Sequence, residues 1–452
     1  MLVAGELSVA TALRGQSLHV QENPAAAPSF PASPSGGREK EGVVRDAGSA
    51  THRAGHDPSR PAARETAWVV LAAGLGTRMK SGLPKILHPL CGRPLGAAIL
   101  QTASRLPQWQ LVVVTGHQAD RVEEELQHWA RRLGVEVTFA RQQPQRGTGH
   151  AVQCALGALE PGIREVLVSY GDVPLLRPET LEELRQARAR SDAALALATA
   201  RLPNPSGYGR VVRAAGRGPQ APVVAVVEEK DATPDQRAID EVNLGVYAFY
   251  RDALEAALES LRPDNAQGEY YLTDAVAYLA RRLCGGNDAD GGPTPGSAGG
   301  PCQGGVVAVP LADPSEGLGV NDRHQLHELE ALLRQRARLA LASRGVSFSG
   351  APPAEVDPWA EADEDCTLYA GARLLGESRL GRGCTLGPGA WVIDSVLEPG
   401  VRVVGNVLVG CHVGRDAQIG PGVTIPAGAR IAPQACIGQA AAVQALQVGG
   451  RR

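Results

Sequence analysis

The feature that most restricts the fold of this chain is a six-residue repeat in its C-terminal region. Past residue 365 an aliphatic residue recurs at every sixth position, often with a glycine beside it. The repeat runs in one register and then in a second, with the members Leu368, Leu374, Leu380, Leu386 and Val392, followed by Val401, Val407, Val413, Ile419, Ile425, Ile431 and Ile437. This period predicts a parallel β-helix, in which stacked coils share an aliphatic core. We expect a short left-handed β-helix of about four coils over residues 346–440, with a tail at 441–452.

Residues 65–327 show a second pattern, in which strand-like segments alternate with helical ones. The strand-like strings are WVVLAA, QLVVVTG, VEVTFA, EVLVSYG and ALALATA. This alternation predicts an α/β domain with a Rossmann-like, mainly parallel sheet. A helix is predicted over 121–133, with a capping-box-like start at Asp120 and Glu123 and a stop at Gly134.

Other segments connect or extend these two regions. Residues 1–64 are rich in Ala, Pro, Ser, Gly and Arg without periodicity, so we expect a disordered extension or a start codon assigned too far upstream. Residues 285–305 have the Gly-rich and Pro-rich composition of a flexible surface insertion. A long helix is predicted over 322–343, and residues 328–345 are assigned as the linker between the two domains.

Composition excludes several classes of function. The 45 Lys plus Arg nearly balance the 48 Asp plus Glu, without a block of like charge, so we expect no nucleic-acid partner. The eight cysteines show no spacing of a zinc site or disulfide framework, and most should be small buried residues. The apolar stretch at 68–73 is too short to cross a bilayer, and Glu6 interrupts the place of a signal peptide's apolar core. We therefore expect a soluble cytoplasmic protein without a membrane partner.

The strongest local signal is the string LAAGLGTRMKSGLPKILH at 71–88, directly after the first predicted strand. A Gly-rich turn at the carboxyl end of a parallel strand leaves backbone N–H groups free to meet phosphate oxygens. Gly74 and Gly76 permit a close approach, while Arg78 and Lys85 supply cations for the charge of a triphosphate. A GxG turn alone fits an ordinary strand-to-helix turn equally well, and only the full string favours nucleotide chemistry.

The full string GxGTRMxSxxPKxLH resembles the signature of sugar-nucleotide pyrophosphorylases. It resembles most the bacterial bifunctional family that acetylates glucosamine 1-phosphate and then uridylylates the product. Further matching strings follow in the expected order and extend the resemblance over 67–343: QQPQRGTGHA, YGDVPLL, SGYGRVVR, VVEEKDAT, EVNLGVY, NAQGEYYLTD and GVNDRHQL. The resemblance implies a Mg²⁺-dependent uridylyltransferase that makes UDP-N-acetylglucosamine and pyrophosphate from UTP and N-acetylglucosamine 1-phosphate, for cell-envelope precursors.

The resemblance also implies which residues form the site. The catalytic cations would be Arg78 and Lys85. The nucleotide contacts would be Leu71, Ala72, Gly74, Arg78, Lys85, Gln142, Gly147 and Thr148. The metal ligands would be Asp172 and Asn321, and the sugar contacts would be Tyr170, Gly209, Glu228 and Asn243.

Several of these assignments have a purely structural alternative. Gln142 and Thr148, expected to read the uracil edge, fit a hydrogen-bonded surface turn as well. Asp172 and Asn321 fit caps of the helices that follow them. Glu228 lies in a charged run and fits a solvated face.

The C-terminal region departs from the family pattern. We find no match to the family's acetyltransferase strings, no lysine after Lys230, and His412 as the only histidine beyond His327. His412 fits a surface position on a coil better than a catalytic base. We therefore expect no acetyltransferase activity, and a β-helix that assembles the chain into a homotrimer through its flat sides.

Two other functions stay open at this point. The first is a pyrophosphorylase of another specificity, acting on dTTP or glucose 1-phosphate, and the strings NAQGEYYLTD and GVNDR argue against it. The second is a non-catalytic regulatory subunit. The retention of Arg78, Lys85, Asp172 and Asn321 argues against that, because a protein without chemistry needs neither the cations nor the metal ligands.

Overall fold

The computed structural model describes residues 64–214, 221–283 and 304–438. The predicted extension at 1–64, insertion at 285–305 and tail at 441–452 lie outside the described residues, apart from Arg64 and the first residues of a strand that begins at Gly304. In the described ranges, we find no helix with the length and apolar character needed to cross a membrane.

Strand β1 (Thr66–Leu71) lies inside the sheet and is buried on both faces. Trp68 and Val70 belong to one apolar cluster, and Ala67 and Val69 to a second cluster on the opposite face. Successive side chains of a strand point to opposite faces, so a strand covered on both sides needs an unbroken apolar run. The sequence AWVV meets that requirement.

Among the described residues, β1 belongs to a nine-stranded sheet with the path β11-β7-β10-β6-β1-β4-β5. The other strands of the path are β4 (Gln110–Thr115), β5 (Val137–Arg141), β6 (Glu165–Tyr170), β7 (Ala193–Arg201), β10 (Glu241–Tyr250) and β11 (Gly304–Pro310). The hairpin β8 (Gly209–Arg213) and β9 (Val223–Val227) pairs beside β10. Strand β10 is antiparallel to both neighbours and the other pairs of the path are parallel, which confirms the mainly parallel sheet.

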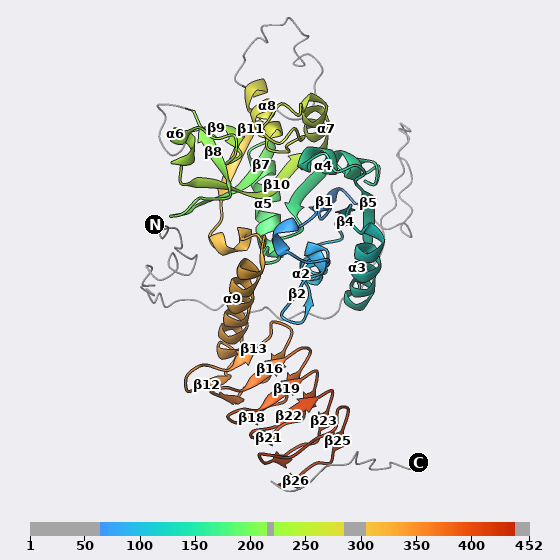
Figure 1. Ribbon diagram of the computed structural model, residues 1–452, viewed down its shortest axis with the longest axis vertical. Helices are drawn as coiled ribbons and strands as arrows, with labels where there is room; N and C mark the ends of the chain where they lie inside the picture. Colours follow the sequence, from blue (N-terminus) through green and yellow to red (C-terminus); the bar gives the residue numbers. More distant parts are fainter. Residues whose placement is uncertain (1–63, 215–220, 284–303, 439–452) are drawn as a thin grey trace, which may run out of the picture. The chain divides into compact units, whose positions relative to one another are not determined.

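Helices cover both faces of this sheet (Figure 1). One cluster takes apolar side chains from α2 (Leu95–Ala103), α3 (Ala119–Leu133), α5 (Pro178–Arg190) and α9 (Arg323–Ala342). The opposite cluster takes them from α4 (Thr148–Leu156), α7 (Arg251–Ser260) and α8 (Asp274–Leu283). The shorter elements are η1 (Thr77–Met79), η2 (Lys85–Leu87), β2 (Pro89–Leu90), β3 (Arg93–Pro94), α6 (Pro234–Arg237) and η3 (Pro314–Gly317).

The predicted helix over 121–133 is present as α3, but its predicted start is wrong. The helix begins at Ala119 after Gln118, which has a left-handed φ of 51° and makes no side-chain cap. Asp120 and Glu123 instead accept hydrogen bonds from Arg141 on β5. A cation on the neighbouring strand therefore binds the carboxylates that the sequence pattern assigns to a capping box.

Helix α9 confirms the long helix predicted over 322–343. Its N-cap is Asp322, whose carboxylate accepts from the backbone N–H of Gln325 at 2.9 Å. Leu326 packs in the core of the α/β domain and Leu341 in the core of the C-terminal region. The helix therefore connects two hydrophobic cores, and the domain boundary assigned at 327/328 falls within it.

The C-terminal region is the predicted parallel β-helix, built from three stacks of short strands (Figure 1). The first stack is β12 (Ser347–Ser349), β15 (Thr367–Tyr369), β18 (Thr385–Leu386), β21 (Arg402–Val403), β24 (Gln418–Ile419) and β26 (Cys436–Ile437). The second is β13 (Glu355–Val356), β16 (Arg373–Leu375), β19 (Trp391–Ile393) and β22 (Val407–Val409). The third is β14 (Glu361–Ala362), β17 (Arg379–Leu380), β20 (Val396–Leu397), β23 (His412–Val413) and β25 (Arg430–Ile431).

The expected number of coils was too small by one. In the described residues, the third stack has five strands and the first stack six, so five coils are complete and β26 begins another. The first coil does not follow the six-residue period. Phe348 pairs with Leu368, 20 residues later, whereas Val356 and Ala362 pair with residues 18 positions later. Two extra residues at the first corner therefore break the period there.

The second predicted register is wrong at Val407. Val407 is 47% exposed, while its neighbour Leu408 is fully buried. The inward aliphatic positions after Val392 are Leu397, Val403, Leu408 and Val413, so three of the four steps contain five residues. Each inward aliphatic residue is also preceded, two positions earlier, by a second inward residue, which is small at most coils. Cys366, Cys384 and Cys411 fill such positions, which confirms the expectation of buried cysteines there.

A matched pair of valines tests this register. Val403 is fully buried and Val404 is 39% exposed, whereas an uninterrupted six-residue period from Leu368 would place Val404 inside. We expect Val403→Ala to lower the free energy of unfolding of the β-helix by about 2 kcal/mol, through lost burial and a cavity. Val404→Ala should cost less than about 0.5 kcal/mol. Chemical denaturation of both variants measures the difference, and a larger cost at Val404 would contradict the assignment.

Candidate active site

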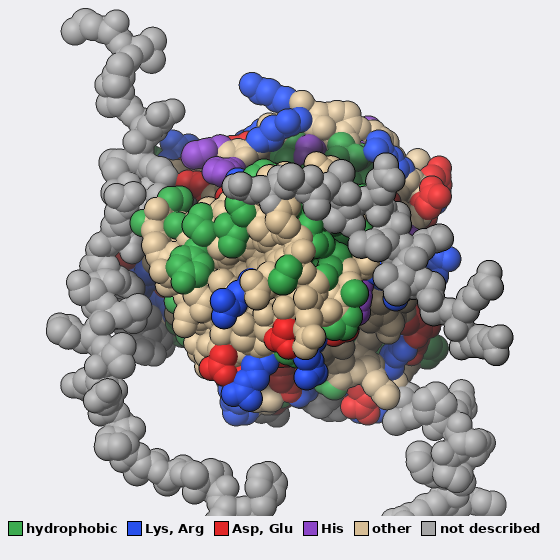
Figure 2. Space-filling model, turned by 90° about the horizontal axis from the view of Figure 1, so that it is seen from below, with side chains coloured by type: hydrophobic (Ala, Val, Ile, Leu, Met, Phe, Trp, Pro, Cys, Tyr) green, Lys and Arg blue, Asp and Glu red, His purple; other side chains and the backbone are tan. Residues whose placement is uncertain are grey.

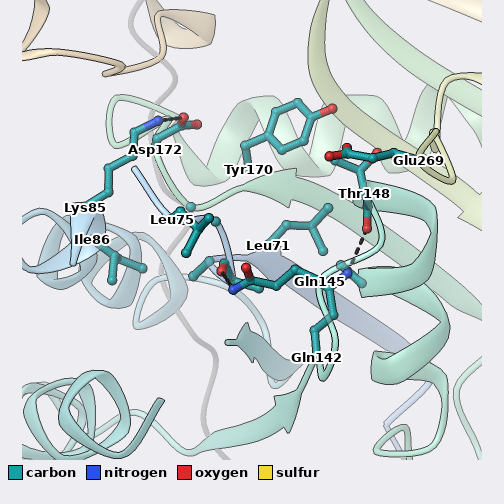
Figure 3. A pocket seen from close by; sticks show the side chains of 16 residues that line it. Leu71, Leu75, Lys85, Ile86, Gln142, Gln145, Thr148, Tyr170, Asp172 and Glu269 are labelled. Atoms are coloured by element: carbon teal, nitrogen blue, oxygen red, sulfur yellow. Dashed lines mark hydrogen bonds and ion pairs between the residues drawn. The ribbon is translucent and has the colours of Figure 1, made fainter. Parts of the chain in front are cut away.

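A cavity of about 310 Å³ lies where β1, β5 and β6 reach their carboxyl ends (Figure 3). Its lining comes from the turn after β1, from η2, from the loop between β5 and α4, from the end of β6 and from the loop before α8. The lining residues are Leu71, Ala72, Ala73, Gly74, Leu75, Lys85, Ile86, Gln142, Gln145, Gly147, Thr148, Ala151, Tyr170, Gly171, Asp172 and Glu269. Parallel α/β sheets place binding sites at this edge, because the loops that leave the strands gather there.

The structure brings most of the predicted site residues to this cavity. Those that line it are Leu71, Ala72, Gly74, Lys85, Gln142, Gly147, Thr148, Tyr170 and Asp172. Arg78 and Asn321 are not among the lining residues, but both lie beside Lys85 through shared hydrogen bonds. Gly209, Glu228 and Asn243 come from β8, the end of β9 and β10, and they lie outside the lining.

Lys85 contacts two acceptor oxygens from distant parts of the sequence. Its ammonium donates to the Asp172 carboxylate at the end of β6, and to Asn321 Oδ1 at 3.2 Å just before α9. Asn321 Oδ1 also accepts from Arg78 at 3.1 Å. Neither Asp172 nor Asn321 caps a helix, since the N-cap of α5 is Arg177 and that of α9 is Asp322. The capping alternatives for Asp172 and Asn321 are therefore wrong.

The turn before α4 is tightly hydrogen bonded. Gln142 Nε2 donates to the Gly147 carbonyl at 2.8 Å, and Thr148 Oγ1 accepts from the Leu272 N–H at 2.9 Å. Gly147 has a φ of 99°, and a Cβ there would lie 2.7 Å from the Tyr270 carbonyl, so only glycine fits. The hydrogen-bonded turn considered for Gln142 and Thr148 is present, and the same two residues also line the cavity.

A second polar group lies behind Tyr170. The Tyr170 hydroxyl is hydrogen bonded to Tyr247, whose oxygen accepts from Asn243 Nδ2 at 2.7 Å. Burial raises the pKa of both phenols above the usual value, so both stay protonated at neutral pH.

The Glu228 carboxylate lies close to this group of phenols. Its Oε1 accepts from the Thr273 hydroxyl at 3.1 Å, and a Cβ on Gly209 would lie 3.6 Å from either carboxylate oxygen. Burial raises the pKa of Glu228, and the charges of Asp231 and Asp274 raise it further. Glu228 is therefore a half-buried group beside Gly209, and the solvated-face alternative is wrong.

Sequence reasoning missed several residues of this site. Gln145 lines the cavity and donates to the Ala73 carbonyl at 2.5 Å, and Glu269 lines the opposite side. Both lie inside strings that match the family pattern, so proximity to those strings was the available signal. Tyr247 and Thr273 also lie inside such strings, EVNLGVY and NAQGEYYLTD, but the sequence pattern reads one as an ordinary strand residue and the other as the start of a helix.

The sheet, the strand-end cavity and its cations together define a nucleotidyltransferase. Residues 68–275 match the family model of the MobA-like NTP transferase domain. The bifunctional protein GlmU of Prochlorococcus marinus is 39% identical over 84% of this chain and 78% of its own length. GlmU of Geobacter metallireducens is 42% identical over 74% of this chain and 64% of its own length. A GlmU of Thermus thermophilus is 40% identical over 82% of this chain and 75% of its own length.

The chain belongs to the bifunctional GlmU family. It is a UDP-N-acetylglucosamine uridylyltransferase, which confirms the function predicted from the motifs. Enzymes of this family use a divalent metal ion and act on a nucleotide and a sugar phosphate. A solved structure of a putative glucose-1-phosphate thymidylyltransferase from Bacillus anthracis also aligns, over 59% of this chain and 94% of its own, at 16% identity and a TM-score of 0.43, which is too remote to add to the assignment.

The half-buried carboxyl group of Glu228 generates a prediction about pH. Its pKa is raised in the folded state, so the folded protein binds this proton more tightly than the unfolded chain. The group therefore destabilises the fold increasingly as the pH rises above the unfolded pKa of about 4.3. We expect Glu228→Gln to melt at a higher temperature than the wild type at about pH 7, with the difference vanishing below about pH 4.

Thermal melts over this pH range test the sign of the effect. Glu124→Gln, at an exposed position on α3, serves as the matched control and should show no such trend. A Glu228→Gln variant that loses stability mainly at high pH would contradict the prediction.

Proposed function

We propose that the acceptor phosphate attacks the α-phosphorus of UTP in line at the carboxyl ends of β1 and β6, and that pyrophosphate leaves. The observation that carries this proposal is the position of Lys85, which lines the cavity while its ammonium contacts both Asp172 and Asn321. A phosphate monoester is already an anion, so neither a covalent nucleophile nor a strong base is required. Positioning and charge neutralisation supply the catalysis.

Asp172 and Asn321 suit a divalent cation. One ammonium group lies within hydrogen-bonding distance of both their oxygens, so a single cation can contact both. Carboxylate and amide oxygens are the ligands that Mg²⁺ prefers, with phosphate and water completing the shell. We propose Mg²⁺ as this ion, whose chemistry is to neutralise phosphate charge. With such an ion held by Asp172 and Asn321, the Lys85 ammonium would be free to bind phosphate oxygen, beside Arg78.

The turn after β1 leaves room for phosphates. A Cβ on Gly74 would meet no atom within 4 Å, and no left-handed φ is found there. Neither packing nor backbone conformation therefore requires glycine at this position. We infer that Gly74 keeps space for the triphosphate, with Leu71 and Ala72 contacting the nucleotide through their backbone.

The two substrates occupy different sides of the cavity in this proposal. Gln142, Gly147 and Thr148 hold the uracil, because they form the rigid turn at one end of the lining. Tyr170, Gly209, Glu228 and Asn243 hold the acceptor sugar, because they converge around a second polar group on β6 and β8–β10. The phosphates of both substrates then meet between them, at Lys85 and Asp172.

Substitutions of the two charged residues test their roles. We expect Lys85→Met to lower kcat by about 100-fold or more while the protein still binds Mn²⁺, because the competing ammonium is gone. Asp172→Asn should lower kcat similarly and weaken Mn²⁺ binding. Lys80→Met is the matched control, since Lys80 is an exposed lysine of the same turn, and its kcat should be unchanged. Near-normal turnover of Lys85→Met would refute the assignment.

Substrate choice is tested by pyrophosphate release from UTP with N-acetylglucosamine 1-phosphate, with and without Mg²⁺. The same assay with dTTP, and with glucose 1-phosphate, covers the alternative specificity. Release that is fastest with UTP and the acetylated sugar supports the proposal. Faster release with either substitute would favour a related pyrophosphorylase, and no release with any pair would favour a regulatory subunit.

We further propose that the chain lacks acetyltransferase activity. In the described part of the β-helix, His412 Nε2 lies 3.0 Å from Glu398 Oε1, so a surface contact holds the ring on its coil. CoA release from acetyl-CoA with glucosamine 1-phosphate would overturn this proposal.

A cytoplasmic location of the protein stays a prediction.

We also propose that the β-helix forms a homotrimer. The outward side chains of its second stack include Trp391, Val407 and Val409, which are 36%, 47% and 39% exposed. Viewed from the β-helix end in Figure 2, hydrophobic side chains gather on one part of the rim and charged ones on another. Large apolar residues on a flat, exposed side favour burial against another subunit. Light scattering at three times the mass of the 47.1 kDa chain supports a trimer, and the mass of a single chain refutes it.

A further inference from the structure

We propose that Tyr247 is a positioning residue that fixes the orientation of Asn243 and Tyr170 toward the acceptor sugar, and thereby helps the enzyme to select an acetamido sugar. This inference rests on the proposed function, because it takes Tyr170 and Asn243 as the sugar contacts. Tyr247 itself lies on β10, is 0% exposed and is absent from the cavity lining, so its influence must pass through its neighbours.

The Tyr247 hydroxyl is hydrogen bonded to both neighbours. Its oxygen accepts from Asn243 Nδ2 at 2.7 Å, and the Tyr170 and Tyr247 hydroxyls are hydrogen bonded to each other. A phenol carries one O–H donor and an acceptor oxygen, so both contacts can form at once. At this buried residue the loss of either bond leaves a polar group without a partner, which costs more than the bond contributes.

These bonds determine which end of the Asn243 carboxamide faces which neighbour. Asn243 Oδ1 accepts from the Gly245 N–H at 3.1 Å while Nδ2 donates to Tyr247. A flipped amide would direct its NH₂ group at the Gly245 N–H, so that contact would be replaced by two facing donors. The amide therefore keeps one N–H and one oxygen lone pair for a ligand. An acetamido group, with one C=O and one N–H, is the complementary partner.

The backbone of β10 makes this arrangement possible. Strand β10 has a bulge between Asn243 and Tyr247. Asn243 pairs with Thr199 and Tyr247 pairs with Leu197, so a separation of four residues on β10 lies opposite a separation of two on β7. Gly245 in the bulge has a φ of 70°, and a Cβ there would lie 2.2 Å from the Tyr170 ring. The Tyr170 ring thus packs directly on the bulge, which brings its hydroxyl to Tyr247.

The nucleotide side of the cavity has no bond to this group. Gln142 and Thr148 are held by Gly147 and Leu272, on the loops flanking α4 and α8. Removal of the Tyr247 hydroxyl should therefore affect the acceptor and leave UTP binding unchanged. A purely structural role would instead lower stability without separating the two substrates.

Tyr247→Phe tests the inference, because it removes the hydroxyl and keeps the ring. We expect the KM for N-acetylglucosamine 1-phosphate to rise about fivefold to tenfold, the effect of one hydrogen bond, with the KM for UTP unchanged. The preference for N-acetylglucosamine 1-phosphate over glucose 1-phosphate, measured as the ratio of kcat/KM values, should fall by a similar factor.

Ser169→Ala is the matched control. The Ser169 hydroxyl is also buried in the sheet, where it accepts from Trp68 Nε1 at 3.0 Å, but it has no bond to Asn243 or to Tyr247. We expect this variant to lose stability with both KM values and the sugar preference unchanged. The melting temperature of both variants is measured alongside the kinetics.

The outcomes separate this inference from the proposed function. An active wild type, combined with a Tyr247→Phe variant whose acceptor KM is unchanged or rises together with the KM for UTP, overturns the positioning role alone. A wild type that releases no pyrophosphate from UTP and N-acetylglucosamine 1-phosphate overturns both. A selective rise in the acceptor KM with loss of sugar preference supports the inference.

Discussion

Burial of the central strands on both faces is the constraint on which the α/β domain depends. The side chains of β1 alternate between two apolar clusters, so its interior has no place for a charged or catalytic group. Polar chemistry is therefore confined to the loops at the strand ends. Because β1, β5 and β6 run in the same direction, their loops meet at one edge and form the cavity there. The site is thus a consequence of the way in which the core is filled.

Around Lys85, the charged groups at this edge of the sheet are paired with one another when no substrate is present. The ammonium lies between a carboxylate just after β6 and an amide ahead of α9, so the cation assigned to the proposed chemistry is already paired. Such an arrangement holds the two oxygens close together, as the proposed divalent ion would require. The side of the cavity proposed for the sugar is organised differently, by neutral phenols and a bulge that leave hydrogen-bonding groups in fixed directions.

The β-helix also depends on filling its interior with apolar side chains, and it does so with a simple repeat. Each side contributes a large aliphatic residue and, two positions earlier, a second residue that is mostly small, so successive coils fill one continuous core. The steps that end at Leu397, Leu408 and Val413 contain five residues instead of six, and these three large residues still point inward. The outward face is free of this restriction, and it carries Trp391 and other large apolar side chains.

The sequence by itself determined the fold class, and it predicted most of the residues that line the cavity. Those residues lie in contiguous strings next to predicted strands, and parallel strands bring such strings together. The start of α3, the coil register and the Tyr247 contacts were decided by the tertiary structure. Arg141 on another strand binds the expected capping residues, and corner lengths shift the coil phase. Each of these depends on which groups meet across the fold, and a local pattern records only neighbours along the chain.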